Sequence, residues 1–146
     1  MPKKETKSNF NNNNKRSIIK ESTNNKMPIW DFSNIDNDGP FKFTSEKIDV
    51  KLFLKILDFS KLTWQQIRAQ THDKGKSSNH YLDYEGISKK GKDRIKIKII
   101  SDDDIDMIFS LRLNNLPRLI GLKRYQVFEV IWYDKNHEFY PAKTAT

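Results

Sequence analysis

Two arginines, a histidine and a tyrosine in the last third of the chain are residue types that could bind an anion and act on it. Arg112 and Arg118 flank a predicted hairpin turn, and His137 and Tyr140 follow the last predicted strand. If the turn centres on Asn115, the arginines are cross-strand partners with Cβ atoms about 5 Å apart, where like charges are destabilising. This predicts a neutralising Asp or Glu, an even-length turn that separates the pair, or a bound anion such as a phosphodiester, which planar guanidinium groups suit.

The segment Asp134–His137, which closes the last predicted strand, admits two interpretations. An Asx-type turn would end the strand there and leave the histidine exposed. Alternatively, His137 is a general acid or base near neutral pH, with its ring oriented by a carboxylate or a carbonyl. Tyr140 either contacts a nucleic-acid base or phosphate, or packs against the sheet edge. Three basic residues near this strand are candidates for nucleic-acid contact: Lys123, Arg124 and Lys135.

The remaining polar residues do not indicate a metal or cofactor site. His72 and His80 lie in a polar, turn-rich loop over residues 71–87 and are expected to be exposed to solvent. The run Asp102–Asp104 is expected to be a solvated turn or a helix cap, because neighbouring side chains on an extended chain point to alternate sides. The chain has no cysteine and no glycine-rich phosphate loop. We therefore predict no metal and no other cofactor.

Most of the net positive charge belongs to the first part of the chain. The sequence carries 27 Lys and Arg against 19 Asp and Glu, a net charge of +8. Residues 1–29 hold seven of the basic and two of the acidic groups, a net of +5, which leaves +3 for the rest. This segment also contains seven asparagines and few apolar side chains, too few to offset its conformational entropy. We expect a disordered Asn- and Lys-rich tail over residues 1–35 and a single α+β domain over residues 36–146.

The sequence carries no signal for a membrane or for secretion. No apolar run approaches the roughly 20 residues that a membrane helix needs. The basic N-terminal segment is not followed by the apolar stretch of a secretory signal peptide. We therefore expect a cytoplasmic protein with no membrane partner.

Hydrophobic periodicity predicts a short strand and then two or three helices in the first part of the domain. Residues 41–44 alternate as a strand does, and Ser45 can cap an amphipathic helix of about 14 residues. Thr63 and Gln66 match a capping box that would begin a second, short helix. A third helix is expected from Ser88 onward.

Three strands follow and are predicted to form an antiparallel β-meander. They cover residues 107–113, 118–122 and 127–133, with a bulge or close packing at Gly121. Two sets of residues are expected to share a core face: Met107, Phe109, Leu111 and Leu113 in the first strand, and Phe128, Val130 and Trp132 in the third. The order of a short strand, two or three helices and a meander is typical of an α+β structure with helices on one face of the sheet.

The order of elements and the strand residues resemble the RelE/ParE toxin superfamily of bacterial type II toxin–antitoxin systems, most closely its ParE-like branch. The resemblance covers roughly residues 39–141 and is carried by Phe109–Arg112, Arg118–Gly121 and Val130–His137. It implies a RelE/ParE-like fold and a small toxin that an antitoxin protein neutralises. Members of the RelE kind cleave mRNA on the ribosome without a metal, whereas members of the ParE kind inhibit DNA gyrase.

Carried onto this chain, the resemblance implies that Arg112 and Arg118 bind phosphate and that His137 and Tyr140 lie near the cleavage chemistry. We therefore hypothesise a metal-independent mRNA endoribonuclease, the toxin of such a system. Its partners would be mRNA on the ribosome and a cognate antitoxin. Two alternatives stay open: a non-enzymatic inhibitor of DNA gyrase, or an accessory domain that only binds nucleic acid or protein.

Overall fold

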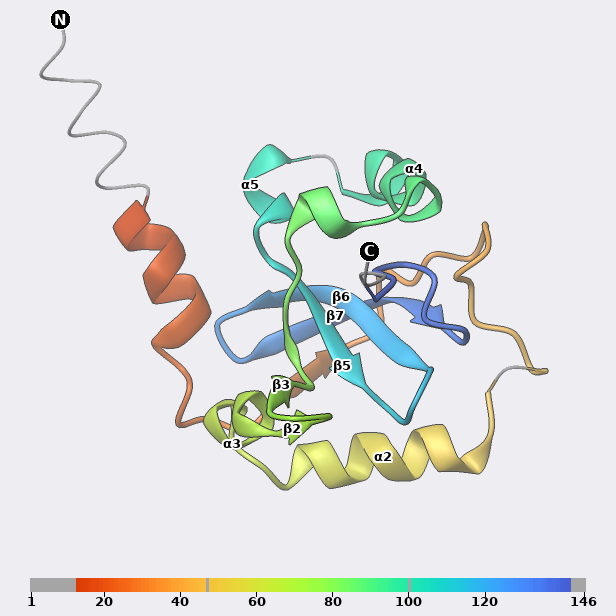
Figure 1. Cartoon of the computed structure of the whole chain (residues 1–146). Coiled ribbons are helices and arrows are strands. Elements are labelled where there is room, and N and C mark those ends of the chain that lie inside the picture. The colour runs from red at the N-terminus through yellow and green to blue at the C-terminus, as the bar shows by residue number, and fades with distance from the viewer. Residues whose placement is uncertain (1–12, 47, 100, 143–146) are drawn as a thin grey trace, which may run out of the picture.

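A five-stranded mixed sheet lies at the centre of the fold, in the order β1-β7-β6-β5-β4 (Figure 1). The computed structural model describes residues 13–46, 48–99 and 101–142. The strands of this sheet are β1 (Ile29–Asp31), β4 (His80–Tyr81), β5 (Ile108–Arg112), β6 (Arg118–Arg124) and β7 (Val127–Asp134). A separate hairpin consists of β2 (Thr71–His72) and β3 (Lys76–Ser77). The helices are α2 (Val50–Ser60), α3 (Trp64–Ala69), α4 (Lys89–Lys98), α5 (Asp102–Ile105), a 3₁₀ turn at Tyr84–Gly86 and a helix over residues 13–21. The fold is thus of the mixed α+β class, as predicted.

Strands β5, β6 and β7 form the predicted antiparallel meander. Its register places Arg112 opposite Arg118, and Arg118 opposite Asp134. The predicted cross-strand pair of arginines is therefore confirmed. Between Ile120 and Gly121 the register of β6 against β7 shifts, which is the bulge predicted at this glycine.

The bulge reverses the face of the sheet on which the side chains at the end of β7 lie. Ile131 is the extra residue of β7 at this position and has no partner in β6. Val130 packs in one core layer together with Phe128, whereas Trp132 packs in the layer on the other face. The prediction that placed Trp132 beside the other two was wrong, because strict alternation does not count the added residue.

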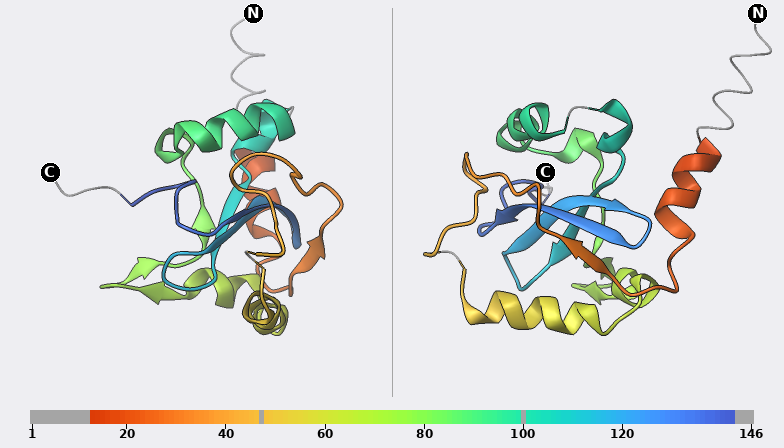
Figure 2. Two further views of the ribbon diagram at one scale, coloured as in Figure 1. Left: turned by 90° about the vertical axis from the view of Figure 1, so that its right-hand side faces the viewer. Right: turned by 180° about the vertical axis from the view of Figure 1, so that it is seen from behind.

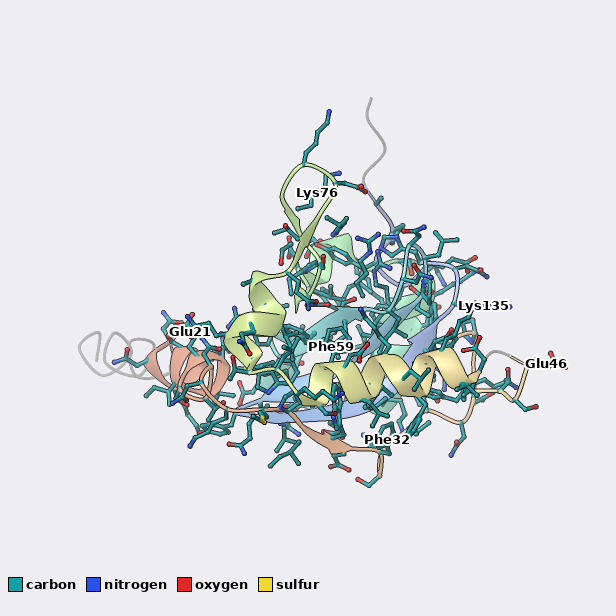
Figure 3. All side chains as sticks on the ribbon, turned by 90° about the horizontal axis from the view of Figure 1, so that it is seen from below. Glu21, Phe32, Glu46, Phe59, Lys76 and Lys135 are labelled. Carbon is teal, nitrogen blue, oxygen red and sulfur yellow. The ribbon has the colours of Figure 1, made fainter. Side chains whose placement is uncertain are left out.

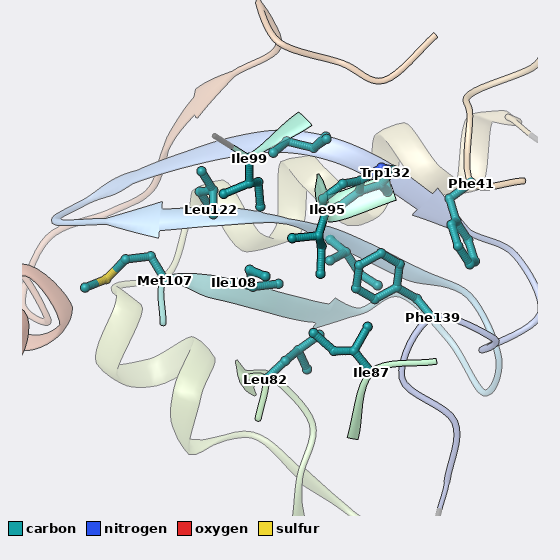
Figure 4. Close-up of a cluster of buried hydrophobic side chains, with 12 residues drawn as sticks. Phe41, Leu82, Ile87, Ile95, Ile99, Met107, Ile108, Leu122, Trp132 and Phe139 are labelled. Atoms are coloured by element: carbon teal, nitrogen blue, oxygen red, sulfur yellow. The ribbon is translucent and has the colours of Figure 1, made fainter. Parts of the chain in front are cut away.

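Both faces of the sheet are buried, and helices cover both of them (Figure 2). On one face, Ile95 of α4 packs in the layer that contains Ile108 and Trp132, which Figure 4 shows. On the other face, Phe59 of α2 and Trp64 of α3 pack with the remaining strand residues. The expectation of helices on one face only was wrong, since the central strands carry apolar residues on both sides.

One residue of the predicted core face packs in the layer opposite to the one predicted. Phe109 and Leu111 share a layer as expected, and Leu113 packs against it. Met107 instead packs in the opposite layer. It belongs to the turn before β5, so the alternation of the strand does not extend to it.

Side chains that accept hydrogen bonds from free backbone amides set the helix starts. Thr63 and Gln66 form the predicted capping box at α3. Ser88 caps α4, the third predicted helix. Helix α2 begins later than predicted, because Asp49 and not Ser45 is its cap. A carboxylate at this position also interacts favourably with the positive end of the helix dipole.

The N-terminal strand lies earlier in the chain than predicted. Residues 41–44 form no strand; β1 takes that role and runs parallel to β7. Its Trp30 packs edge-on against Phe128 and contacts Trp64, with ring centroids 5.8 Å and 6.4 Å apart respectively. Strand β1 therefore belongs to the main sheet.

This placement corrects the expected boundary at residue 36. Within the segment expected to be disordered, residues 13–21 are helical and Ile29–Asp31 form β1. The average composition of the whole segment concealed the apolar residues at its end. Residues 1–12 of the expected tail lie outside the described residues.

Replacement of Gly121 by alanine is expected to destabilise the fold by about 3 kcal/mol. A Cβ atom there would collide with the carbonyl oxygen of Glu129 and lie 3.2 Å from the nitrogen of Ile131, both backbone atoms that cannot rotate away. Urea unfolding measures the loss. Gly75→Ala is the comparison: a Cβ there has open space but a φ of +87°, which costs about 1 kcal/mol. Equal losses in both variants would contradict the bulge argument.

Candidate anion-binding site

All three histidines of the chain line one pocket of about 660 Å³. The pocket lies at the end of the sheet where the β5–β6 turn, the β2–β3 hairpin and the segment after β7 meet. Its polar lining combines the histidines with cationic and hydroxyl side chains: His72, His80, His137, Lys76, Arg112, Arg118, Ser77, Ser78, Ser110 and Tyr140. Among the described residues, Asp73 is the only acidic one in the lining. The pocket is therefore suited to an anionic ligand.

The sheet places four of these side chains on one face. His80 of β4 is the cross-strand partner of Ser110 in β5. Arg112 lies two residues further along β5, on the same face, and is the partner of Arg118 in β6. Pairing with directly opposite neighbours brings the Cβ atoms to about 5 Å. The floor of the pocket is therefore set by strand register.

The turn after β7 positions His137. The carboxylate of Asp134 accepts hydrogen bonds from the backbone amides of Glu138 and Phe139, at 2.9 and 2.8 Å. These bonds reach residues four and five positions on, whereas an Asx turn bonds two positions on, so the expected Asx-type turn is not the one formed. The loop that they close gives His137 a φ of +58°. Left-handed backbone of this kind is uncommon outside glycine, asparagine, aspartate and histidine. The histidine is half-buried and lines the pocket, so the turn presents it to the ligand space.

The β2–β3 hairpin forms one wall of the pocket and carries His72. Its turn has left-handed backbone at Asp73, Lys74 and Gly75. The Nδ1 atom of His72 lies 3.0 Å from the hydroxyl of Ser78. Figure 3 shows the hairpin standing out from the body of the domain, with Lys76 on it.

His80 is held by its own strand. Its Nδ1 donates to the carbonyl oxygen of Tyr81 at 3.0 Å, which leaves Nε2 for a ligand. The expectation that His72 and His80 are solvent-exposed loop residues is corrected, because both are half-buried in the pocket wall. No local spacing pattern signals either residue. His80 reaches the pocket because β4 pairs with β5, and His72 because the β2–β3 hairpin forms a wall of the pocket.

Arg118 closes the β5–β6 turn. Its Nη1 donates to the backbone carbonyls of Asn114, Asn115, Leu116 and Pro117, at 2.9 to 3.3 Å. The side chain is nearly fully buried. Its pKa is lowered by burial and then by the charge of its cross-strand arginine. Arg118 thus has a structural role in addition to lining the pocket.

Hydrogen bonds to carbonyl oxygens of the turn, and a favourable charge interaction of Arg118 with Asp134, offset the two like charges. Arg112 donates through Nε to the carbonyl of Asn114 at 3.1 Å and through Nη2 to Oδ1 of Asn115 at 3.2 Å. Asp134 lies on the far side of Arg118, and within the described part of the chain no ion pair joins the two. Of the three predicted arrangements, a neutralising acid between the arginines is absent there. Arg112, the more exposed of the two, lines the pocket and remains available to an anion.

The surroundings of two histidines favour their neutral form. Burial lowers the pKa of His137, and Arg118 and Arg112 lower it further, against an opposing effect of Asp134. Burial likewise lowers the pKa of His72, followed by the effect of Arg112. A neutral imidazole at pH 7 can accept a proton, so both residues are suited to general-base chemistry.

Tyr140 borders the same space. Its ring lies 6.0 Å from that of His80, in an edge-on arrangement. A Cβ atom on Gly86 would lie 2.6 Å from the tyrosine ring, so the close approach of these segments requires glycine there. The tyrosine is half-buried, packs against the core and also lines the pocket.

The three candidates for nucleic-acid contact are not brought to the pocket. Lys123 is fully buried, with its Nζ bonded to the carbonyls of Lys20 and Tyr125 at 3.1 and 3.0 Å, and burial lowers its pKa to about 8. A buried ammonium cannot contact nucleic acid, so this assignment is corrected. Arg124 is engaged by two carboxylates at the opposite end of β6. Lys135 is exposed in the turn after β7 but does not line the pocket.

Among the described residues, no three His, Cys, Asp or Glu side chains are grouped so that they could hold a metal ion. No helix in that part of the chain is both long enough and apolar enough to cross a membrane. A scan against protein-family models and searches of curated proteins and of solved structures found no match to this sequence or fold.

Proposed function

We propose that the chain is a metal-independent endoribonuclease that acts as the toxin of a type II toxin–antitoxin system. The observation that carries the proposal is the gathering of every histidine of the chain with two cross-strand arginines in one pocket. Cations that bind a phosphodiester and imidazoles that move protons are the two requirements of RNA cleavage by the 2′-hydroxyl. The meander that follows the helices and carries the two arginines also supports the RelE/ParE resemblance.

The chemistry can be assigned to named atoms. Neutral His137 accepts the proton of a ribose 2′-hydroxyl while its oxygen attacks the adjacent phosphorus. The P–O5′ bond breaks, and the 5′-oxygen takes the Nε2 proton of doubly protonated His80, whose Nδ1–H stays bonded to the carbonyl oxygen of Tyr81. The Arg112 guanidinium stabilises the charge on the phosphate oxygens. The products are a 2′,3′-cyclic phosphate and a free 5′-hydroxyl.

The purified protein is expected to cleave single-stranded RNA in the presence of EDTA, because its own cations bind the phosphate. Gel analysis should show fragments that end in a cyclic phosphate. A matched oligonucleotide with 2′-deoxyribose at every position should stay intact, since it has no attacking hydroxyl. Absence of RNA cleavage together with loss of DNA gyrase supercoiling activity would overturn the proposal in favour of the gyrase inhibitor.

The proposal includes a cognate antitoxin as protein partner. Helix α2 leaves large apolar side chains exposed at helical spacing on its outer side: Val50, Phe53, Leu54 and Leu57, with 71, 60, 51 and 40% of their surface exposed. Monomeric proteins rarely leave such a stripe uncovered, which supports a protein partner. Growth arrest by the chain should be relieved by co-expression of the neighbouring reading frame, and persistent arrest would count against this partner.

A further inference from the structure

A second pocket adjoins the candidate site across the β5–β6 turn. It has a volume of about 460 Å³. Ser78, Arg112 and Asn115 line both pockets, so the two share a wall. The other lining residues come from α2, the end of α3, β2 and the β5–β6 turn: Lys55, Gln70, Thr71, Leu113 and Asn114.

The second pocket presents hydrogen-bond donors and no carboxylate. No Asp or Glu of the described part of the chain lines it, and Lys55 supplies a cation. The Oε1 atom of Gln70 accepts from Asn79 at 2.9 Å, so the NH₂ group of this glutamine is left for a ligand. Oδ1 of Asn115 is likewise occupied by Arg112, at 3.2 Å. Such a lining selects a ligand rich in acceptor oxygens and nitrogens.

Buried Asn79 fixes the two pockets relative to each other. Its side-chain NH₂ donates to Gln70 and to the carbonyl of Ile67, and its Oδ1 accepts from the backbone amide of Arg112 at 2.8 Å. The asparagine therefore connects the end of α3 with β5. The side chain of Gln70 in the second pocket and the backbone of Arg112, which lines both pockets, are thereby held at a constant separation. A ligand that spans both pockets requires such a fixed separation.

We propose that the second pocket binds the nucleotide next to the one whose phosphodiester lies among the histidines. Lys55 binds the phosphate of that neighbouring nucleotide, and the NH₂ groups of Gln70 and Asn115 donate to acceptor atoms of its base. Single-stranded nucleic acid then follows a track that crosses Arg112. The inference rests on the proposed function, since it extends the same site by one nucleotide.

Binding of short oligodeoxynucleotides tests the track without cleavage, because they lack the attacking hydroxyl. Fluorescence anisotropy should show that a trinucleotide binds at least about tenfold more tightly than a dinucleotide, the usual effect of one charge-assisted contact. Lys55→Ala should remove this gain and leave dinucleotide affinity unchanged. In Lys55→Ala the negative slope of log affinity against log salt for the trinucleotide should become less steep by about 0.7, the value for one phosphate contact on a single strand.

Lys51→Ala is the matched control. Lys51 lies on the same helix and is exposed, lines neither pocket, and its replacement changes the net charge equally. Gln70→Glu is the second variant: it keeps the acceptor for Asn79 but replaces the donor NH₂ by a carboxylate, so trinucleotide binding should weaken. Equal affinity losses for Lys51→Ala and Lys55→Ala, or an unchanged gain with length in Lys55→Ala, would overturn the inference.

The outcomes separate this inference from the proposed function. If trinucleotide binding gains affinity through Lys55 but RNA is not cleaved, the second nucleotide site is supported and the nuclease function is overturned. RNA cleavage without a Lys55-dependent gain supports the nuclease and removes the track.

Discussion

Replacement of His137 by asparagine is expected to lower the rate of RNA cleavage by about 10²- to 10⁴-fold, the usual contribution of a general acid or base. Asparagine is the sharpest substitution here because the residue has a φ of +58°, which asparagine tolerates and alanine does not. The turn around Asp134 should therefore keep its shape. What is lost is the titratable ring that lines the pocket.

Single-turnover cleavage of a defined RNA measures the effect, with urea unfolding as the test of fold. Lys135→Ala is the control, because this residue lies in the same turn, is exposed and does not line the pocket. Its rate should match that of the unaltered protein. A loss of rate in the control as large as in His137→Asn would assign the effect to the turn and not to proton transfer.

The pH profile distinguishes proton transfer by His137 from a positioning role. Burial and then Arg118 lower the pKa of this residue below its ordinary 6.5. The base is therefore already neutral at pH 7, and protonation of its ring should lower the rate only when the pH falls below 6.5. The residual rate of His137→Asn should lack this decline. An identical profile in both proteins would count against the base.

Residues within one hairpin could be placed from the sequence, whereas those joined by distant pairing could not. The turn between Arg112 and Arg118 is short, so its centre alone decides which residues face each other. His80 enters the site because β4 pairs with β5. His72 enters it because the β2–β3 hairpin forms a wall of the pocket at the same end of the sheet. No residue pattern within the polar segment that contains these two histidines indicates that it lies against this end of the sheet.

Charge alone also misplaced Lys123. A lysine near a predicted turn is usually exposed, and this one was expected to meet nucleic acid. Strand β6 in fact continues to Arg124, so Lys123 points into the domain, where Nζ lies 4.8 Å from the ring centroid of Trp64. One of the two carbonyls that accept from it belongs to Lys20, in the helical segment expected to be disordered. The two errors are thus connected, because the N-terminal segment supplies one of the partners of this buried ammonium.

Replacement of Asp36 by asparagine is expected to destabilise the fold by about 3–5 kcal/mol, the usual effect of breaking a buried ion pair from one side. Asp36 is 2% exposed and accepts from Nε and Nη2 of Arg94 at 2.9 and 2.8 Å. It also accepts from the indole of Trp132 at 2.9 Å. The carboxylate therefore joins α4 to β7, and its loss leaves the half-buried guanidinium of Arg94 without its paired carboxylate. Urea unfolding gives the free-energy change.

The comparison is Asp93→Asn, which breaks the exposed pair between Lys89 and Asp93 on the same helix and should cost less than about 1 kcal/mol. The pH dependence adds a second test. Burial acts to raise the pKa of Asp36, but the hydrogen bonds from Arg94 and Trp132 outweigh it and hold the pKa below the ordinary 3.8. Its stabilising effect is thus fully present above that value and is lost as the pH falls through the lowered pKa. The stability gap between the unaltered protein and Asp36→Asn should therefore narrow only in strong acid, and a gap that already closes near pH 6 would contradict the buried pair.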